Sequence, residues 1–230
     1  MALPATTYMN GLSALAVMAF GYSTGVVFLA KYFREGRKKR LRPYVALTGF
    51  TGGSFYLGPV ASFFHVLATG ENLDFITYGF LSYAHVPLAI VNAMYLGFEL
   101  FHPAVRNRVV ALFAASAIPY WIALLGFPEA MVAPEDVRPG ELVDVQLQSV
   151  VLVLVTFYVL STLFVLGGGF NHLRKRLPEG VERKKAGHLA LGWVLFAAGA
   201  ILDTVIATQF VVVARVVMAA GFYNISAGFW

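Results

Sequence analysis

The sequence predicts an all-α integral membrane protein whose chain forms a bundle of seven transmembrane helices. Of the 230 residues, 59% are hydrophobic and 13% are charged, and the mean hydropathy is +0.72. These values lie outside the balance found in soluble domains. The apolar residues also gather in runs long enough to cross a bilayer, with the charges between them. We therefore expect a single transmembrane domain, 1–230, that is multi-pass in the cell membrane with the lipid bilayer as its surroundings.

Seven apolar runs of membrane length follow one another along the chain. The expected spans are 8–30, 44–68, 75–100, 108–127, 147–169, 188–207 and 210–230. An odd number of crossings places the two termini on opposite sides of the membrane.

The charges between the spans predict the orientation. The connections 31–42 and 172–185, together with Arg106 and Arg108, hold 15 of the 17 lysines and arginines. The alternate connections are acidic, and basic connections lie on the cytoplasmic side. The N-terminus is therefore expected outside and the C-terminus inside. The long outer connection 128–146 carries three prolines, which favours a disordered crossover over a lid on the bundle mouth.

Spans one to three and five to seven share a charge pattern. In each triplet a basic connection follows the first span and a short outer turn follows the second. This favours a 3+1+3 pseudo-repeat of two parallel triplets, with span four between them.

Polar side chains recur every seven residues through the third span, at Tyr78, His85, Asn92 and Glu99. Seven residues are close to two helical turns, so the four lie in one stripe. An unpaired polar group in hydrocarbon costs several kcal/mol, so the stripe is expected to face the bundle interior. A packing seam of interhelical hydrogen bonds and a ligand pocket or proton path both fit this pattern.

A pocket, if present, is expected beside His85. Pro59 and Pro87 interrupt the helical hydrogen bonding of spans two and three, and such kinks widen cavities. The candidate ligand-binding residues are His85, Asn92, Tyr78, Trp121, Trp193, Tyr223 and Asn224. Aromatic residues in membrane proteins are also common as interfacial anchors and in packing.

Asp203 and Arg215 are the charged residues well inside spans six and seven. If the chain turns near Thr208 and Gln209, the two lie at equal depth, about 9 Å below the outer end by helical rise. Because an isolated charge in the bilayer is costly, we expect a direct or water-bridged ion pair. It would act as a structural clasp or as a gate at the outer mouth.

Several classes of function are not expected. The chain has no cysteine, which excludes thiolate metal sites and a cysteine nucleophile. No close-spaced metal-ligand pattern, Gly-x-Ser-x-Gly elbow or phosphate-cradling loop occurs, so no metal site and no enzyme activity are expected. Haem is not expected either, because His65 and His85 differ in depth by more than about 10 Å. The net charge of +5 lies in the short connections and does not indicate a nucleic-acid partner.

The order of these features resembles the microbial-opsin superfamily. Tyr83-Ala84-His85 is similar to the opsin third-helix segment, with His85 where an acidic proton acceptor usually stands, and Ala214-Arg215 is similar to the alanine and the Schiff-base lysine of the last helix. The resemblance implies a seven-helix bundle with its N-terminus outside. No lysine lies inside a span, and an arginine cannot form the Schiff base, so covalent retinal is not expected. The outline also resembles the seven-helix input domains of bacterial sensor proteins.

Together these features favour a receptor-like or sensory membrane protein with an intramembrane pocket for a non-covalent small ligand. The alternative is a small-solute or proton-coupled transporter built from the two triplets. A structural or haem-binding membrane subunit is a lesser alternative. A sensor would signal through a cytoplasmic transducer, and a homo-oligomer is also compatible with the sequence.

Overall fold

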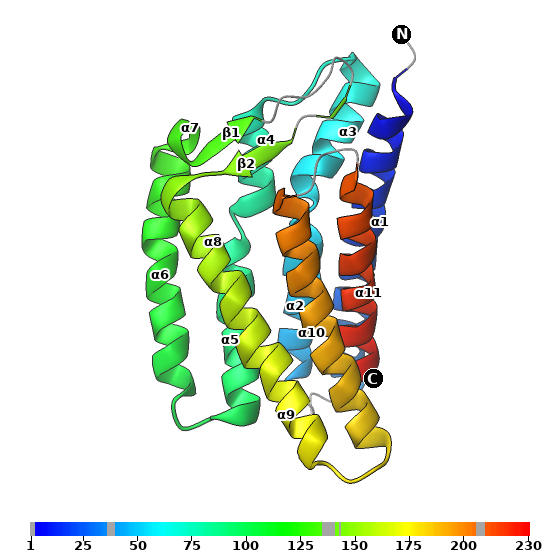
Figure 1. The fold of residues 1–230 in the computed structure, drawn as a ribbon, viewed down its shortest axis with the longest axis vertical. Coiled ribbons are helices and arrows are strands. Elements are labelled where there is room, and N and C mark those ends of the chain that lie inside the picture. The colour runs from blue at the N-terminus through cyan, green and yellow to red at the C-terminus, as the bar shows by residue number, and fades with distance from the viewer. Residues whose placement is uncertain (1–2, 36–39, 135–140, 143, 206–209) are drawn as a thin grey trace.

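The computed structural model describes residues 3–35, 40–134, 141–142, 144–205 and 210–230. Long helices packed side by side form the body of the molecule (Figure 1). The elements, in chain order, are α1 (Ala5–Arg34), α2 (Arg42–Ser54), α3 (Leu57–Thr69), α4 (Phe75–Tyr83), α5 (Val86–Phe101), α6 (Arg106–Gly126), α7 (Pro128–Met131), β1 (Val132–Pro134), β2 (Val145–Leu147), α8 (Ser149–Thr162), the π-helical segment η1 (Leu163–Gly168), α9 (Gly169–Arg176), α10 (Val181–Val205) and α11 (Val211–Phe229).

Six helical segments of the described chain are long and apolar enough to cross a membrane. They are Ala5–Arg34, Phe75–Phe101, Arg106–Gly126, Ser149–Arg176, Val181–Asp203 and Val211–Phe229. The all-α, multi-pass membrane class predicted from composition is therefore confirmed. The expected count of seven continuous spans is not, because the second expected span, 44–68, is not one helix.

The second expected span is divided into α2 and α3, which have 13 residues each. They lie one above the other in the bundle (Figure 1). The division falls at Phe55 and Tyr56, four and three residues before Pro59. Pro59 has no N–H to donate to the carbonyl of Phe55, and its ring crowds the preceding turn. The kink expected from Pro59 is thus a full break between two helices.

The third expected span also has an interruption, between α4 and α5, but it remains one membrane-length segment, Phe75–Phe101. The break falls at Ala84 and His85, just before Pro87 in the first turn of α5. Proline is well tolerated there, because the N–H that it lacks would belong to the first helical turn. Both polar positions above and below the break, Tyr78 and Asn92, still face the protein.

Close helix packing holds α1 against α2. Gly21 and Gly25 on α1 meet Gly49 and Gly53 on α2, and a Cβ on Gly21 would lie 2.7 Å from the Gly53 Cα. Glycines spaced four apart on both helices allow the backbones to approach, as in the small-residue contacts of membrane helices. This contact fixes α2, and hence the break at Phe55, beside α1.

The outer connection 128–146 is partly ordered over the end of the bundle. β1 and β2 pair antiparallel, with Val132 opposite Leu147 and Pro134 opposite Val145. Leu142 is buried against Phe63 and Val66 of α3. The expectation of a disordered crossover is wrong for these described residues, because apolar side chains anchor them to α3. Residues 135–140 and 143 of this connection lie outside the described part of the chain.

The two ends of the bundle differ in charge. At one end, Thr6 near the N-terminus donates a hydrogen bond to Glu141 of the outer connection. At the other end, Arg40 and Arg106 come from two basic connections and both pair with Glu99. Lys31 lies over the ring of Trp230 at the C-terminus. The acidic connections and the N-terminus thus share one end, and the basic connections and the C-terminus share the other.

Candidate functional site

The two helix breaks meet inside the bundle. Phe55 follows the last residue of α2, and His85 precedes the first residue of α5. Their rings stack with centroids 5.2 Å apart and planes inclined by 22°. Two interrupted helices therefore meet at their interruptions, through an aromatic ring and an imidazole.

Helix α6 supplies the hydrogen bonds that the break in the third span leaves open. The carbonyl of Tyr83 would be the partner of residue 87, which is a proline without an N–H. The Tyr120 hydroxyl donates to this carbonyl at 2.8 Å, and the indole N–H of Trp121 donates to the carbonyl of Ala84 at 2.6 Å. Side chains of a neighbouring helix thus satisfy backbone groups that hydrocarbon could not.

His85 itself is half-buried, and its Nε2 is fully shielded. Among the described residues this nitrogen has no hydrogen-bond partner. Burying a ring nitrogen without a partner costs free energy, because its hydrogen bonds to water are lost and no hydrogen bond within the protein replaces them. The energetic penalty makes Nε2 the atom of this junction best suited to bind an added polar group.

Aromatic rings continue from the junction into α10 and α11. The ring centroids of Phe55 and Phe196 are 6.2 Å apart. The Phe196 centroid lies 6.0 Å from that of Trp193 and 5.3 Å from that of Phe222. The indole nitrogen of Trp193 is also buried without a hydrogen-bond partner in the described chain. Of the predicted ligand residues, His85 and Trp193 are thus the two with a shielded, unused polar atom attached to this ring cluster.

Asn92 and Tyr78 join helices instead of lining the junction. The Asn92 amide donates to the carbonyl of Tyr44 at 2.9 Å and to the Thr48 hydroxyl at 2.8 Å, which ties α5 to α2. The Tyr78 hydroxyl donates to Asp144 of the outer connection at 3.0 Å. These contacts are those of a packing seam, although the Asn92 Oδ1 is buried without a partner in the described chain. Unlike the Asn92 amide and the Tyr78 hydroxyl, the His85 side chain makes no hydrogen bond to another helix among the described residues, and its Nε2 is shielded.

Trp121, Tyr223 and Asn224 lie in different settings. The N–H of Trp121 is engaged by the Ala84 carbonyl, next to His85. Tyr223 is 61% exposed and points out of the bundle, because it follows the buried Phe222 by one position, about 100° around the helix. The Asn224 amide lies 2.9 Å from His188 and donates to the carbonyl of Ala220. The contacts of Tyr223 and Asn224 therefore do not bring them to His85.

Arg215 is buried, but its direct contacts are with α1 and with Tyr56, the residue that precedes α3. It is 4% exposed, and its guanidinium donates to the carbonyl of Asn10 and, at 3.0 Å, to the Ser13 hydroxyl. It also lies over the ring of Tyr56, 5.5 Å from the centroid. No direct Asp203–Arg215 contact occurs among the ion pairs of the described residues.

The direction of Arg215 follows from the rotation of α11. Ala214 and Met218 face α10, since a Cβ on Gly199 would lie 3.1 Å from the Ala214 carbonyl oxygen and 2.2 Å from Met218. The next position along the helix points toward α1. The equal depth of Asp203 and Arg215 does not determine how α11 is rotated about its axis. The expected turn at Thr208 and Gln209 lies outside the described residues.

Metal ligands do not cluster in the part of the chain that the structure describes. No three His, Cys, Asp or Glu side chains there come close enough to hold one metal ion. His188 pairs with Asn224, and His102 lies beside the ring of Phe98.

Two residues of the junction were missing from the predicted set, namely Phe55 and Tyr120. Pro59 and Pro87 were the available signals, because each marks the place where a carbonyl four residues earlier loses its helical partner. Comparison of the chain with models of protein families, with curated proteins and with solved structures finds no match in any of the three.

Proposed function

We propose that this protein is a receptor-like, sensory membrane protein that binds a small polar ligand at His85. The observation that carries the proposal is the shielded Nε2 of His85, which has no partner in the described chain and lies where two interrupted helices meet. A hydrogen-bonding ligand would remove the cost of this unpartnered nitrogen. An intramembrane polar side chain with no structural partner is a functional candidate on physical grounds.

The breaks would couple binding to a change of shape. A ligand at Nε2 would bind more tightly at one angle between α4 and α5 than at another. This difference in affinity would shift the equilibrium toward the angle that binds the ligand better. The angle is held by Tyr120 and Trp121, so a change would be passed to α6. Phe55 would pass it to α2 in the same way.

The proposed topology counts α2 and α3 together as one crossing. Seven crossings would put the two termini on opposite sides of the membrane, and the charge difference between the bundle ends favours an N-terminus outside. The basic end would face the cytoplasm and would be the surface for a transducer. The 3+1+3 arrangement and the resemblance to opsins, without covalent retinal, stay predictions.

One observation favours a second candidate, a small-solute or proton-coupled carrier. Carriers often build their sites from discontinuous helices near the middle of the membrane, and α2–α3 and α4–α5 are two such helices. In a carrier the breaks would be part of the transport path and would not serve mainly as hinges.

Mass spectrometry of co-purifying small molecules tests the binding proposal. The key variant is His85→Phe, which keeps a ring to stack on Phe55 and removes both nitrogens, and the matched control is His65→Phe on α3. We expect wild-type protein and H65F to retain the same small polar molecule after mild extraction, and H85F to lose it. Retention by all three would contradict the proposal. Flux of that molecule into liposomes containing only this protein would favour the carrier.

A further inference from the structure

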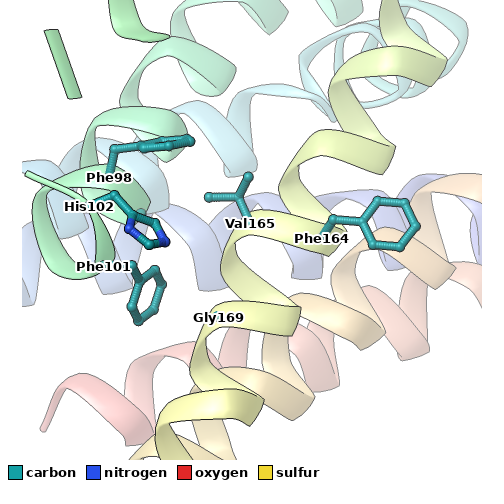
Figure 2. Close-up of a pocket in the computed structure, with 7 residues that line it drawn as sticks. Phe98, Phe101, His102, Phe164, Val165 and Gly169 are labelled. Atoms are coloured by element: carbon teal, nitrogen blue, oxygen red, sulfur yellow. The ribbon is translucent and has the colours of Figure 1, made fainter. Parts of the chain in front are cut away.

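A second site lies at the basic end of the bundle, between the end of α5 and the π-helical segment η1. It is a pocket of about 200 Å³. Figure 2 shows Phe98, Phe101 and His102 on one side of it and Phe164, Val165 and Gly169 on the other. His102 follows His85 by 17 positions, about 25 Å along a helix, so this pocket is separate from the junction.

Two glycines and the π-helical turn shape the pocket. A Cβ on Gly97 would lie 2.6 Å from Val165, and a Cβ on Gly169 would lie 2.5 Å from the ring of Phe101. The helices therefore touch at these glycines. Val165 belongs to η1, which ends directly before Gly169. The hydrogen bonds of η1 join residues five apart instead of four apart, which widens the helical turn. Such π-helical turns occur frequently at functional sites.

The pocket opens toward the surroundings of the bundle. Phe164 is 71% exposed, in the middle of a helix segment apolar enough to cross the membrane. Its walls are aromatic and aliphatic, and His102 is the one lining side chain that carries a polar group. An apolar slot in this position is filled by hydrocarbon more favourably than by water.

Positive charge lies on α9, beyond the pocket residue Gly169. Helix α9 continues for seven residues past Gly169, about 10 Å, and its last turn holds Arg174, Lys175 and Arg176. Arg176 lies two turns from Gly169 on the same face of the helix. His172 and Arg176 are both exposed. An apolar slot that leads to basic side chains is complementary to a hydrocarbon chain that carries an anionic head group.

We propose that this pocket binds one anionic membrane phospholipid of the leaflet on the basic side. Its hydrocarbon chain lies between Phe98, Phe101 and Val165, and its phosphate lies at the level of His102, His172 and Arg176. The bound lipid fills the gap beside η1 and links the ends of α5 and α9. This role is independent of any ligand at His85.

Photo-crosslinking locates the lipid. The probe is an anionic phospholipid with a diazirine in its acyl chain, incorporated in nanodiscs with the full-length protein. We expect labelled peptides from 98–102 and 164–169, and at least a tenfold loss of label in Val165→Phe, which fills the slot. The matched control is Val153→Phe, the same change on an exposed position of α8. Equal labelling of the two variants would overturn the proposal.

Thermal stability in detergent tests whether the pocket prefers an anionic lipid. This test does not use V165F, so its result stands even if that variant folds poorly. A delipidated sample is titrated with phosphatidylglycerol or with phosphatidylcholine of the same chains. We expect a saturable rise in Tm with the anionic lipid alone, because a ligand of the folded state stabilises it. Arg176→Gln should raise the half-saturating concentration severalfold, whereas Arg34→Gln on α1, which removes one charge elsewhere, should not. Equal responses to both lipids, or equal effects of R176Q and R34Q, would contradict the proposal.

Discussion

The imidazole of His85 stacks on the ring of Phe55 at the point where both of their helices are interrupted. Each interruption precedes a proline, Pro59 or Pro87, and the two prolines are far apart in the sequence. The stack therefore joins the two places where the helical hydrogen bonding of the second and third spans is interrupted. It leaves Nε2 of His85 shielded and without a partner in the described chain.

Tyr120→Phe tests how α6 supports the break. The change leaves the Tyr83 carbonyl without its hydrogen bond, so we expect a loss of about 1 kcal/mol in the free energy of unfolding. The matched control is Tyr158→Phe, because the Tyr158 hydroxyl contacts the Ser116 hydroxyl, which keeps a bond to the Phe113 carbonyl. Unfolding in mixed micelles measures the loss of unfolding free energy in Y120F and in Y158F. Losses of equal size in the two variants would argue against a special role for Tyr120.

Pro87→Ala should weaken the dependence on Tyr120. An alanine at 87 supplies an N–H that can bond to the Tyr83 carbonyl, which is the ordinary helical partner four residues earlier. In a double-mutant cycle, Y120F should therefore cost less in the P87A background than in the wild type, with a coupling of about 0.5 to 1.5 kcal/mol. Additive losses would show that the two groups do not compete for this carbonyl.

The sequence predicts the inward face of the third span but not what each polar residue does there. The inward direction follows from the cost of polar groups in hydrocarbon, which holds for any fold. The Asn92 amide bonds to Thr48, whereas the His85 ring stacks on Phe55. Which of these contacts forms depends on how far α2 and α5 are shifted along each other. This shift is set by distant contacts such as the glycines of α1 and α2.

Two other expectations differ in part from the structure, for identifiable reasons. Proline and glycine content suggested a disordered crossover over 128–146, but among its described residues Leu142 packs on Phe63 and β1 pairs with β2. Equal depth suggested a direct or water-bridged ion pair between Asp203 and Arg215. The guanidinium contacts Asn10 and Ser13 of α1 directly, and the water-bridged pair stays a prediction. Side-chain direction around a buried helix is decided by packing and is not encoded in local spacing.

Arg215 and Ser13 should be energetically coupled. Ser13→Ala removes one acceptor of the buried guanidinium, and we expect a loss of about 1 kcal/mol that disappears in an Arg215→Met background. The same cycle with Asp203→Asn tests the remaining alternative, an ion pair through water. Additivity of D203N and R215M would show that the two charges do not interact, whereas a coupling above about 1 kcal/mol would show the interaction that a water-bridged pair requires.

Asp74 should make the end of the bundle that holds the acidic connections sensitive to acid. It is the N-cap of α4, and hydrogen bonds from the side chain and the backbone N–H of Thr77 lower the pKa of its carboxyl group. A group whose pKa is lower in the folded state stabilises fully above its unfolded pKa of about 3.9, and this stabilisation is lost as the pH falls through the folded pKa.

Asp74→Ala is therefore expected to lower stability at pH 7 by about 1 kcal/mol, the usual value of an N-cap. The difference from wild type should shrink as the pH falls below 4, as measured by Tm against pH. Glu71→Ala, a nearby carboxylate that caps no helix, is the control. A difference between D74A and wild type that stays constant down to pH 3 would contradict the capping role.

The central claim, that His85 contacts a small ligand at the meeting point of the breaks, is tested most directly by restoring what purification removes. Protein washed exhaustively in detergent is mixed with the small-molecule fraction of its own wash, and Tm is measured for wild type and H85F. The account predicts that the fraction raises the Tm of the wild type by several degrees and leaves that of H85F unchanged. A rise of the same size in both proteins, or no rise in either, would contradict it.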